Sequence, residues 1–275
     1  MEADIKPKSN KVNGTDKGKT RTRKNTDDIK PKSNIVFGRN PVYEYLKSGQ
    51  TVDQIFFHDK IKRNDWMDKT IQLAKEQSIK YSFVPKEKLN TLVGKENHQG
   101  VMAFISPVSY SSVEDILGYA KSLGEKPFIV ILDSIQDPHN LGAIIRTAVA
   151  VGVHGIIIPK HGSVSVTDTV FKTSAGTVQK CKIAKVTNLV QTIEKLKQED
   201  IWIYGADGRG KKNIFETDFQ GGVAIVMGSE GKGLHQKVAE HCDFLVKIPM
   251  KNAVESLNVS VSAGLLIYKV FESRL

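Results

Sequence analysis

Short apolar runs alternate with segments of helical spacing through the chain from residue 127 onward. The runs are rich in Ile and Val and have the sequences PFIVILDS, GIIIPK, CKIAKV, IWIYGAD, VAIVMG and FLVKIP. Helical patterns such as NLGAIIRTAVAVG and NLVQTIEKLKQED lie between most of them. Uniformly apolar strands that alternate with helices are typical of a parallel sheet covered on both faces. The pattern therefore predicts an α/β domain over residues 127–275, with a doubly wound parallel sheet.

A smaller α/β module is predicted over residues 35–106. A short helix is expected after Pro41 and ends at Gly49, and VDQIFF is strand-like. WMDKTIQLAKEQSI then has helical spacing, and KYSFVP is expected to be the next strand. Residues 107–126, which include SYSSVEDILGYAKSLGEK, are predicted to form a connecting helix and linker between the two domains.

Positive charge is concentrated at the start of the chain. Residues 1–34 hold 10 Lys or Arg against 5 Asp or Glu, which is half of the net charge of +10. With few apolar residues, this segment is predicted to be a disordered basic tail. It contains DIKPKSN twice, which indicates low-complexity duplication. A basic tail favours a polyanion partner, and a purely solubilising tail is an equal alternative.

The overall composition is that of a soluble protein, with 40% hydrophobic and 25% charged residues. No apolar stretch reaches the length of a membrane span, and no secretory signal is visible, so we expect a cytoplasmic protein without a membrane partner. Cys181 and Cys242 do not indicate a disulfide framework. His235 and His241 lie near Cys242 but match no standard zinc spacing, so no metal site is expected.

The stretch MGSEGKGL, which follows VAIV, is the first candidate for a ligand-binding loop. It is neither a Walker loop nor a dinucleotide fingerprint, because its glycines follow the pattern GxxGxG after a late strand. Glu230 would repel a phosphate and tolerate a cation. Taken alone, the stretch is more often a tight turn with a solvated Glu.

In two other stretches, polar residues lie next to a pattern of helical spacing. In ILDSIQDPHNLGAIIRTA, Asn140 suits a helix N-cap, and Arg146 is expected to project from a face other than the apolar one. In IPMKNAVESLNVSVSAG, a polar turn leads into a helix. Each can be ordinary capping and packing. This last helix has an apolar stripe, formed by Leu257, Val261, Leu265 and Tyr268. It also has a stripe of small residues, which permits close backbone approach and is formed by Ser256, Ser260 and Gly264.

Together and in this order, PHNLGAIIRTA, MGSEGKGL and IPMKNAVESLNVSVSAG closely resemble the three signature motifs of the SpoU/TrmH class of SPOUT methyltransferases. The first module, which ends in HQGV, is similar to the L30e/L7Ae-like RNA-binding domain of the RlmB-type branch of that class. The resemblance implies a trefoil-knotted, Rossmann-like sheet in residues 127–275, and a homodimer. Threaded chains are rare, so the strand pattern alone would not suggest a knot.

The resemblance also implies an activity: methyl transfer from S-adenosyl-L-methionine to the 2'-hydroxyl of a ribose in RNA. The RlmB-type branch acts on a guanosine of large-subunit (23S) ribosomal RNA, free or in an assembling large subunit. The family motifs place the cofactor against Gly228, Ile248 and Leu257, with Met227, Gly233 and Met250 as further wall residues. The motif residues that correspond to the catalytic set are Asn140, Arg146, Glu230, Ser256 and Asn258.

Physical chemistry constrains the expected role of Arg146. A guanidinium has a pKa above about 12, so it is a poor base at neutral pH. We expect Arg146 to bind the target phosphate and to stabilise the developing alkoxide. Glu230 is expected to orient Arg146 or Asn140, and Ser256 and Asn258 are expected to hold the loops and the ribose.

Other functions stay open on the sequence. The nearest alternatives are a transfer RNA ribose methyltransferase and a ribosomal RNA methyltransferase of the thiostrepton-resistance type. A noncatalytic RNA-binding protein with the same fold is a third, but it would have no need of all five motif residues. A nucleotide-dependent oxidoreductase is disfavoured by the late position of the glycine loop and by Glu230.

Overall fold

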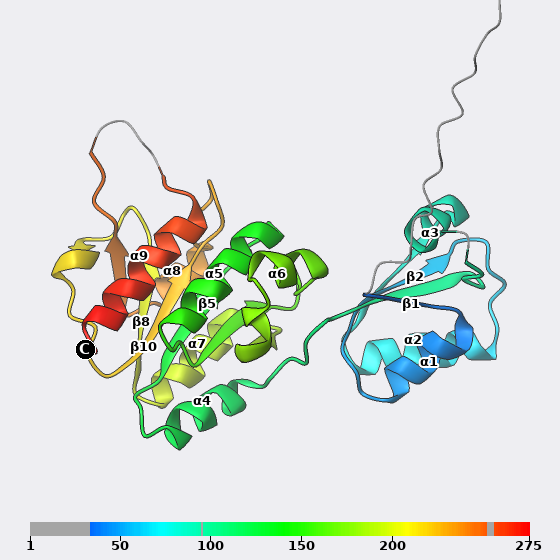
Figure 1. Cartoon of the computed structure of the whole chain (residues 1–275), viewed down its shortest axis with the longest axis horizontal. Coiled ribbons are helices and arrows are strands. Elements are labelled where there is room, and N and C mark those ends of the chain that lie inside the picture. The colour runs from blue at the N-terminus through cyan, green and yellow to red at the C-terminus, as the bar shows by residue number, and fades with distance from the viewer. Residues whose placement is uncertain (1–33, 95, 252–255) are drawn as a thin grey trace, which may run out of the picture.

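Two separate β-sheets organise the described part of this computed structural model, residues 34–94, 96–251 and 256–275 (Figure 1). The predicted basic tail, apart from Asn34, lies outside the described residues. No helix within the described residues is long and apolar enough to cross a membrane.

The smaller sheet lies in the N-terminal domain and has the strand order β1-β4-β2-β3. Strand β4 runs antiparallel to β1 and β2, and β2 runs parallel to β3. Helices α1 and α2 cover one face, and α3 covers the other. The elements are β1 Ile35–Phe37, α1 Arg39–Lys47, β2 Val52–His58, α2 Asp65–Glu76, β3 Lys80–Val84, α3 Lys86–Val93 and β4 Val101–Ile105.

The larger sheet has seven strands in the order β7-β6-β5-β10-β8-β11-β9, with parallel pairing throughout the ladders that join them. The strands are β5 Phe128–Leu132, β6 Gly155–Pro159, β7 Ile183–Val186, β8 Ile201–Ala206, β9 Lys212–Asn213, β10 Gly222–Met227 and β11 Phe244–Lys247. The α/β class and the parallel sheet predicted from the apolar runs are therefore confirmed. The trefoil knot implied by the resemblance stays a prediction.

Helices cover both faces of this sheet. Helices α5 and α9 lie side by side on one face with α6 beside α5, and α4, α7 and α8 pack on the other (Figure 1). Short 3-10 turns at Thr177–Lys180 and Ile214–Glu216 complete the connections. The helices are α4 Val113–Ser122, α5 Pro138–Ala150, α6 Asp168–Thr173, α7 Leu189–Gln198, α8 Gln236–Glu240 and α9 Val259–Glu272.

Helix α4 falls within residues 107–126, the segment expected to form a connecting helix and linker. Ile116 of α4 is fully buried in the core of the larger domain. A methyl group added to Gly155 of β6 would lie 2.5 Å from the Ile116 side chain, so helix and strand are in close contact. The Ser111 amide also donates to the Ile183 carbonyl (2.8 Å). This part of the segment is thus packed against the large sheet.

Helix α5 begins earlier than the sequence suggested. The N-cap is Asp137, whose side chain accepts a hydrogen bond from the His139 amide (2.9 Å), and Pro138 occupies the first turn. The prediction that Asn140 caps the helix is wrong, because Asp137 and Pro138 supply the favoured cap and first residue. Asn140 is buried within the first turn, which leaves its side-chain amide available for contacts to other segments.

Helix α9 faces the sheet with a different stripe from the one of small residues. Its buried residues are Val259, Ala263, Leu266, Ile267 and Val270. Within this chain no close backbone approach is formed at Gly264, since a methyl group there would meet no atom within 4 Å. The spacing of the core-facing residues places Gly264 away from the sheet.

The tightest helix contact is instead at Gly142 of α5. An alanine methyl there would lie 1.9 Å from Thr173 Oγ1 and 2.7 Å from Thr173 Cβ in α6. We therefore expect Gly142→Ala to lower the free energy of unfolding by about 1–3 kcal/mol, because α6 must move away from α5. Urea denaturation followed by circular dichroism measures the change.

Gly118→Ala provides the matched control, because Gly118 is also helical and a methyl group there would meet no atom within 4 Å. That variant should gain roughly 0.5–1 kcal/mol through helix propensity. Equal stability of the two variants would contradict the tight α5–α6 contact.

Candidate active site

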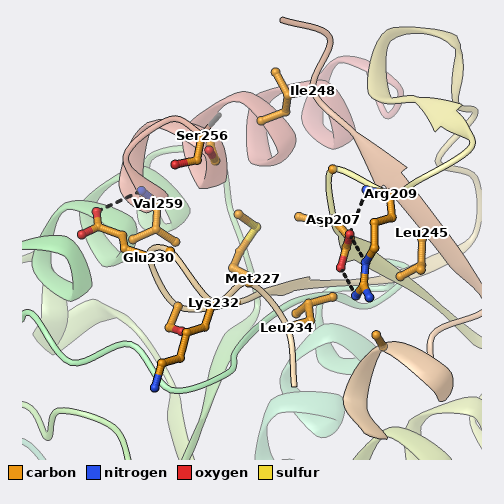
Figure 2. A pocket seen from close by; sticks show the side chains of 18 of the residues that line it. Asp207, Arg209, Met227, Glu230, Lys232, Leu234, Leu245, Ile248, Ser256 and Val259 are labelled. Atoms are coloured by element: carbon orange, nitrogen blue, oxygen red, sulfur yellow. Dashed lines mark hydrogen bonds and ion pairs between the residues drawn. The ribbon is translucent and has the colours of Figure 1, made fainter. Parts of the chain in front are cut away.

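A cavity of about 830 Å³ opens at the carboxyl ends of β8, β10 and β11. Its walls come from the turn after β8, the glycine loop after β10, helix α8, the end of β11 with the segment after it, and the start of α9 with the residues before it. Figure 2 shows Glu230 and the Asp207–Arg209 pair on opposite sides of the cavity, with Met227 between them. Ligands of parallel α/β sheets bind at this edge.

All six residues expected to contact the cofactor line this cavity: Met227, Gly228, Gly233, Ile248, Met250 and Leu257. Of the five expected catalytic residues, Glu230 and Ser256 also line it. Asn140 and Asn258 contact Glu230 from behind the lining. Arg146 is not part of the wall of this cavity.

The loop after β10 folds back on itself. The Ser229 amide donates to the Gly233 carbonyl (3.0 Å), and the Gly233 amide donates to the Ser229 carbonyl (2.9 Å). A Cβ on Gly228 would lie 2.1 Å from the Gly233 carbonyl carbon, so a side chain at residue 228 would break the loop. The glycine at 228 therefore serves a backbone-to-backbone contact at the cavity wall.

The other end of this loop is held by Asp133, which follows β5 and is buried. Its Oδ2 accepts a hydrogen bond from the His235 amide (2.7 Å), and its Oδ1 lies 2.8 Å from His235 Nδ1. The loop is thus anchored to the central strand β5. The described residues contain no group of three or more His, Cys, Asp or Glu side chains that could hold a metal ion.

A hydrogen-bond network joins Glu230 to the other two motifs. Its Oε1 accepts from Asn140 Nδ2 (3.1 Å), from Asn258 Nδ2 (2.6 Å) and from the Val259 amide (3.3 Å). Asn258 Nδ2 also donates to Asn140 Oδ1 (3.0 Å), and Asn258 Oδ1 caps α9 by accepting from the Ser260 amide (2.9 Å). Glu230 therefore orients Asn140, one of the two residues expected to be its target.

Arg146 lies on the exposed face of α5, two turns after Asn140. Its guanidinium has no hydrogen-bond or ion-pair partner among the described residues, so the contact expected with Glu230 is not formed. A free guanidinium on an exposed face is well suited to an anion such as a phosphate. Ser256 is exposed at the rim of the cavity.

Sequence reasoning missed the turn after β8, GADGRG. Arg209 donates from Nε to Asp207 Oδ1 (2.9 Å) and from Nη2 to Asp207 Oδ2 (2.7 Å), and both residues line the cavity. The hydrogen bond from Arg209 lowers the pKa of the Asp207 carboxyl. The turn could have been found from its place after an apolar strand, because ligands bind beyond the carboxyl ends of parallel strands.

Both cysteines are free thiols. Burial raises the pKa of Cys181 and that of Cys242 to about 12. Only a thiolate is a good nucleophile, so neither side chain is reactive at neutral pH.

Comparisons with known proteins bear on this site. A model of the SpoU rRNA Methylase family matches residues 127–268, more than half of the chain. The chain belongs to the SpoU rRNA methylase family. The resemblance inferred from the three motifs is thereby confirmed, and the protein is an RNA methyltransferase of the SpoU/TrmH type. A second model, described as RNA 2'-O ribose methyltransferase substrate binding, matches residues 35–111.

Two family members from bacteria align over most of their length. A protein of Bacillus subtilis (strain 168), YacO, described as a TrmH family tRNA/rRNA methyltransferase, is 43% identical over 239 residues, which are 87% of this chain and 95% of that protein. A protein of Staphylococcus saprophyticus with the same family description is 41% identical, over 87% of this chain and 96% of its own length.

Solved structures share the fold at lower identity. The SpoU methyltransferase AviRb of Streptomyces viridochromogenes, in complex with AdoMet, has a TM-score of 0.56 and 22% identity, and covers 87% of this chain and 89% of its own. The AdoMet-bound rRNA methyltransferase of Sinorhizobium meliloti has a TM-score of 0.53 and 22% identity, and covers 88% and 87%.

The Glu230 network leads to a stability prediction. Glu230→Ala removes the acceptor shared by Asn140 and Asn258, and Asn140 is only 7% exposed. We expect the free energy of unfolding to fall by about 1 kcal/mol. This is the low end of the cost of an unpaired buried polar group, because Glu230 itself is exposed to water. Thermal and urea unfolding measure the loss.

Glu230→Gln keeps an acceptor oxygen, so it should lose less stability than Glu230→Ala. Lys232→Ala, in the same loop, removes an exposed side chain without a hydrogen-bond partner in the described chain and serves as the control. If Lys232→Ala destabilised the fold as much as Glu230→Ala, the network would not be what joins the motifs.

Proposed function

We propose that this chain transfers a methyl group from S-adenosylmethionine to the 2'-hydroxyl of a ribose in RNA, at a guanosine of 23S ribosomal RNA. The observation that carries the proposal is the convergence of the three motifs. Asn140, Glu230 and Asn258 form one network beside a cavity that all six expected cofactor residues line.

The residues of the cavity fit S-adenosylmethionine, the molecule bound in the AviRb and Sinorhizobium structures. Apolar walls are supplied by Met227, Ile248 and Leu257, and the backbone at Gly228 leaves no room for a side chain. A carboxylate at the rim, Glu230, is compatible with a sulfonium cation and would disfavour a phosphate. S-adenosylmethionine supplies an electrophilic methyl group to a site of this kind.

The chain's own groups would position the RNA. The unpaired guanidinium of Arg146 can bind the phosphate of the target nucleotide and stabilise negative charge that develops on the ribose oxygen. Arg146 acts as a cation in this role, because a guanidinium group is not deprotonated in proteins. The amide groups of Asn140 and Asn258 are held by Glu230, which reduces the freedom that must be lost when the ribose is aligned.

The N-terminal domain supports ribosomal RNA as the substrate. Its family model is described as the substrate-binding part of RNA 2'-O ribose methyltransferases. A solved structure that concerns methylation of C/U34 on tRNA aligns over 97% of its own length but covers only 54% of this chain. That protein therefore has no counterpart to the remaining part of this chain. Transfer RNA is the second candidate substrate, because the relatives' descriptions name both tRNA and rRNA.

The central test is a map of 2'-O-methyl groups in ribosomal and transfer RNA, from cells with the gene, without it, and with the Arg146→Ala variant. We expect one large-subunit guanosine to lose its methyl group without the gene, and the variant to restore less than about 1% of the methylation rate, a loss of roughly 3 kcal/mol in transition-state stabilisation. Calorimetry should show unchanged S-adenosylmethionine binding by the purified variant.

An unchanged map would exclude the proposed activity, and loss at a tRNA position would move it to the second substrate. Full methylation by Arg146→Ala would remove the role assigned to that residue.

We also propose that the chain forms a homodimer through the outer face of α9. Three large apolar side chains on this helix are exposed in the single chain: Val261 (53%), Leu265 (37%) and Tyr268 (53%). They form one stripe along the helix, because they are spaced four and three residues apart. An exposed apolar stripe beside the catalytic helix α5 is typical of a protein interface.

Light scattering should give twice the mass of one chain for the natural protein, and about one chain mass for the Val261→Glu, Tyr268→Glu double variant, since two charges would be buried at the interface. Leu123→Glu is the control, because Leu123 is 50% exposed on α4's side of the sheet. A natural protein of single-chain mass would rule out the dimer.

A further inference from the structure

A second cavity, of about 230 Å³, lies between the two domains and shares no lining residue with the first. The N-terminal domain contributes residues 49–53 and 77–80. The methylase domain and the segment before α4 contribute Tyr110, Ser111, Lys160, His161 and Lys185. This interdomain cleft is formed only when the two domains are held together.

A largely buried ion pair joins the two sides of the cleft. Lys185 Nζ on β7 lies 2.5 Å from Asp53 Oδ1 on β2 and 2.8 Å from Ser165 Oγ. The same ammonium lies 4.2 Å from the centre of the Tyr110 ring. The side chains of Lys185 and Asp53 are only 15% and 10% exposed. Because its charge is matched by Asp53, Lys185 serves to hold the domains together.

Two other lysines of the cleft are unpaired. Lys80 begins β3 and Lys160 follows β6, and neither has an ion-pair or hydrogen-bond partner from its side chain within the described residues. Asp53 is the one acidic residue in the lining, and it already pairs with Lys185. The cleft therefore presents net positive charge, bordered by the polar groups of Gln50, Gln77 and Ser78.

The loop that carries Lys160 is joined to the catalytic helix. The Val164 amide and Ser163 Oγ both donate to the Ile135 carbonyl (2.8 Å each). Ile135 lies two residues before Asp137, the cap of α5. Strands β6 and β5 are neighbours, so the cleft and the active site lie along one edge of the sheet.

We propose that the interdomain cleft binds the RNA strand next to the target nucleotide, with Lys80 and Lys160 each neutralising a backbone phosphate. This inference rests on the proposed function, since it takes RNA as the substrate. The cavity is smaller than the ~300 Å³ at which sites for drug-sized ligands begin, which suits one nucleotide unit of a chain. Unpaired lysines on both domains would let the strand bridge them.

The test measures RNA affinity of the full-length chain without any methyl transfer. The probes are a fluorescein-labelled single-stranded RNA of mixed sequence, and protein-free ribosomal RNA from cells that lack the gene. The Lys80→Gln, Lys160→Gln double variant should bind both about tenfold more weakly at 0.15 M salt. Its plot of log affinity against log salt should be shallower by about 1.4, because each single-strand phosphate contact contributes roughly 0.7.

The matched control is the Lys62→Gln, Lys195→Gln double variant. It removes the same charge from one exposed lysine in each domain, and neither lysine lines the cleft or has an ion-pair partner in the described chain. Its affinity and salt slope should stay near those of the natural protein. Both double variants should keep the natural melting temperature and S-adenosylmethionine affinity.

An unchanged affinity of the cleft variant, or an equal loss in the control, overturns the inference. The two proposals can fail separately. If RNA binding depends on Lys80 and Lys160 but the protein methylates no RNA, the cleft is an RNA-binding site and the proposed activity is wrong.

Discussion

The carboxylate of Glu230 is the interaction on which the arrangement of the site depends. One of its oxygens accepts hydrogen bonds from Asn140, Asn258 and the Val259 amide, which belong to two other segments. These bonds join the loop after β10 to the first turn of α5 and to the start of α9. An acidic residue in a glycine loop would repel a phosphate ligand. Its presence here is explained by its role as hydrogen-bond acceptor and by a methyl donor that is a cation.

Close backbone contacts complete the cavity that this network borders. Gly228 packs against Gly233, and a methyl group on Gly210 would lie 2.7 Å from the Leu245 carbonyl, so the loops after β10 and β8 both need glycine. Asp133 then anchors the far end of the β10 loop to the middle of the sheet. Because parallel strands end at one edge, these loops and the interdomain cleft follow one another along that edge.

Much of the fold and of the cavity could be predicted from the sequence. The apolar runs indicated the strands, and the six residues that the three motifs led us to expect at the cofactor all line the cavity. The predictions were wrong where neighbouring residues, or the faces of one helix, have similar local preferences. Asp137 and Asn140 are both good N-caps, and Pro138 favours the earlier one. On α9 neither of the two stripes named from the sequence faces the sheet, and the buried stripe includes Leu266 and Ile267.

The α/β class, the alternation of strands and helices, and the residue types at the site follow from the sequence alone, because periodicity and motif chemistry are local. Which of these residues meet depends on the three-dimensional packing. Glu230 and Asn140 are 90 residues apart, Asn258 and Asn140 are 118 apart, and Lys185 and Asp53 are 132 apart. Such contacts depend on the order of strands in the sheet and on the packing of the two domains, and neither is encoded in any short stretch of the chain.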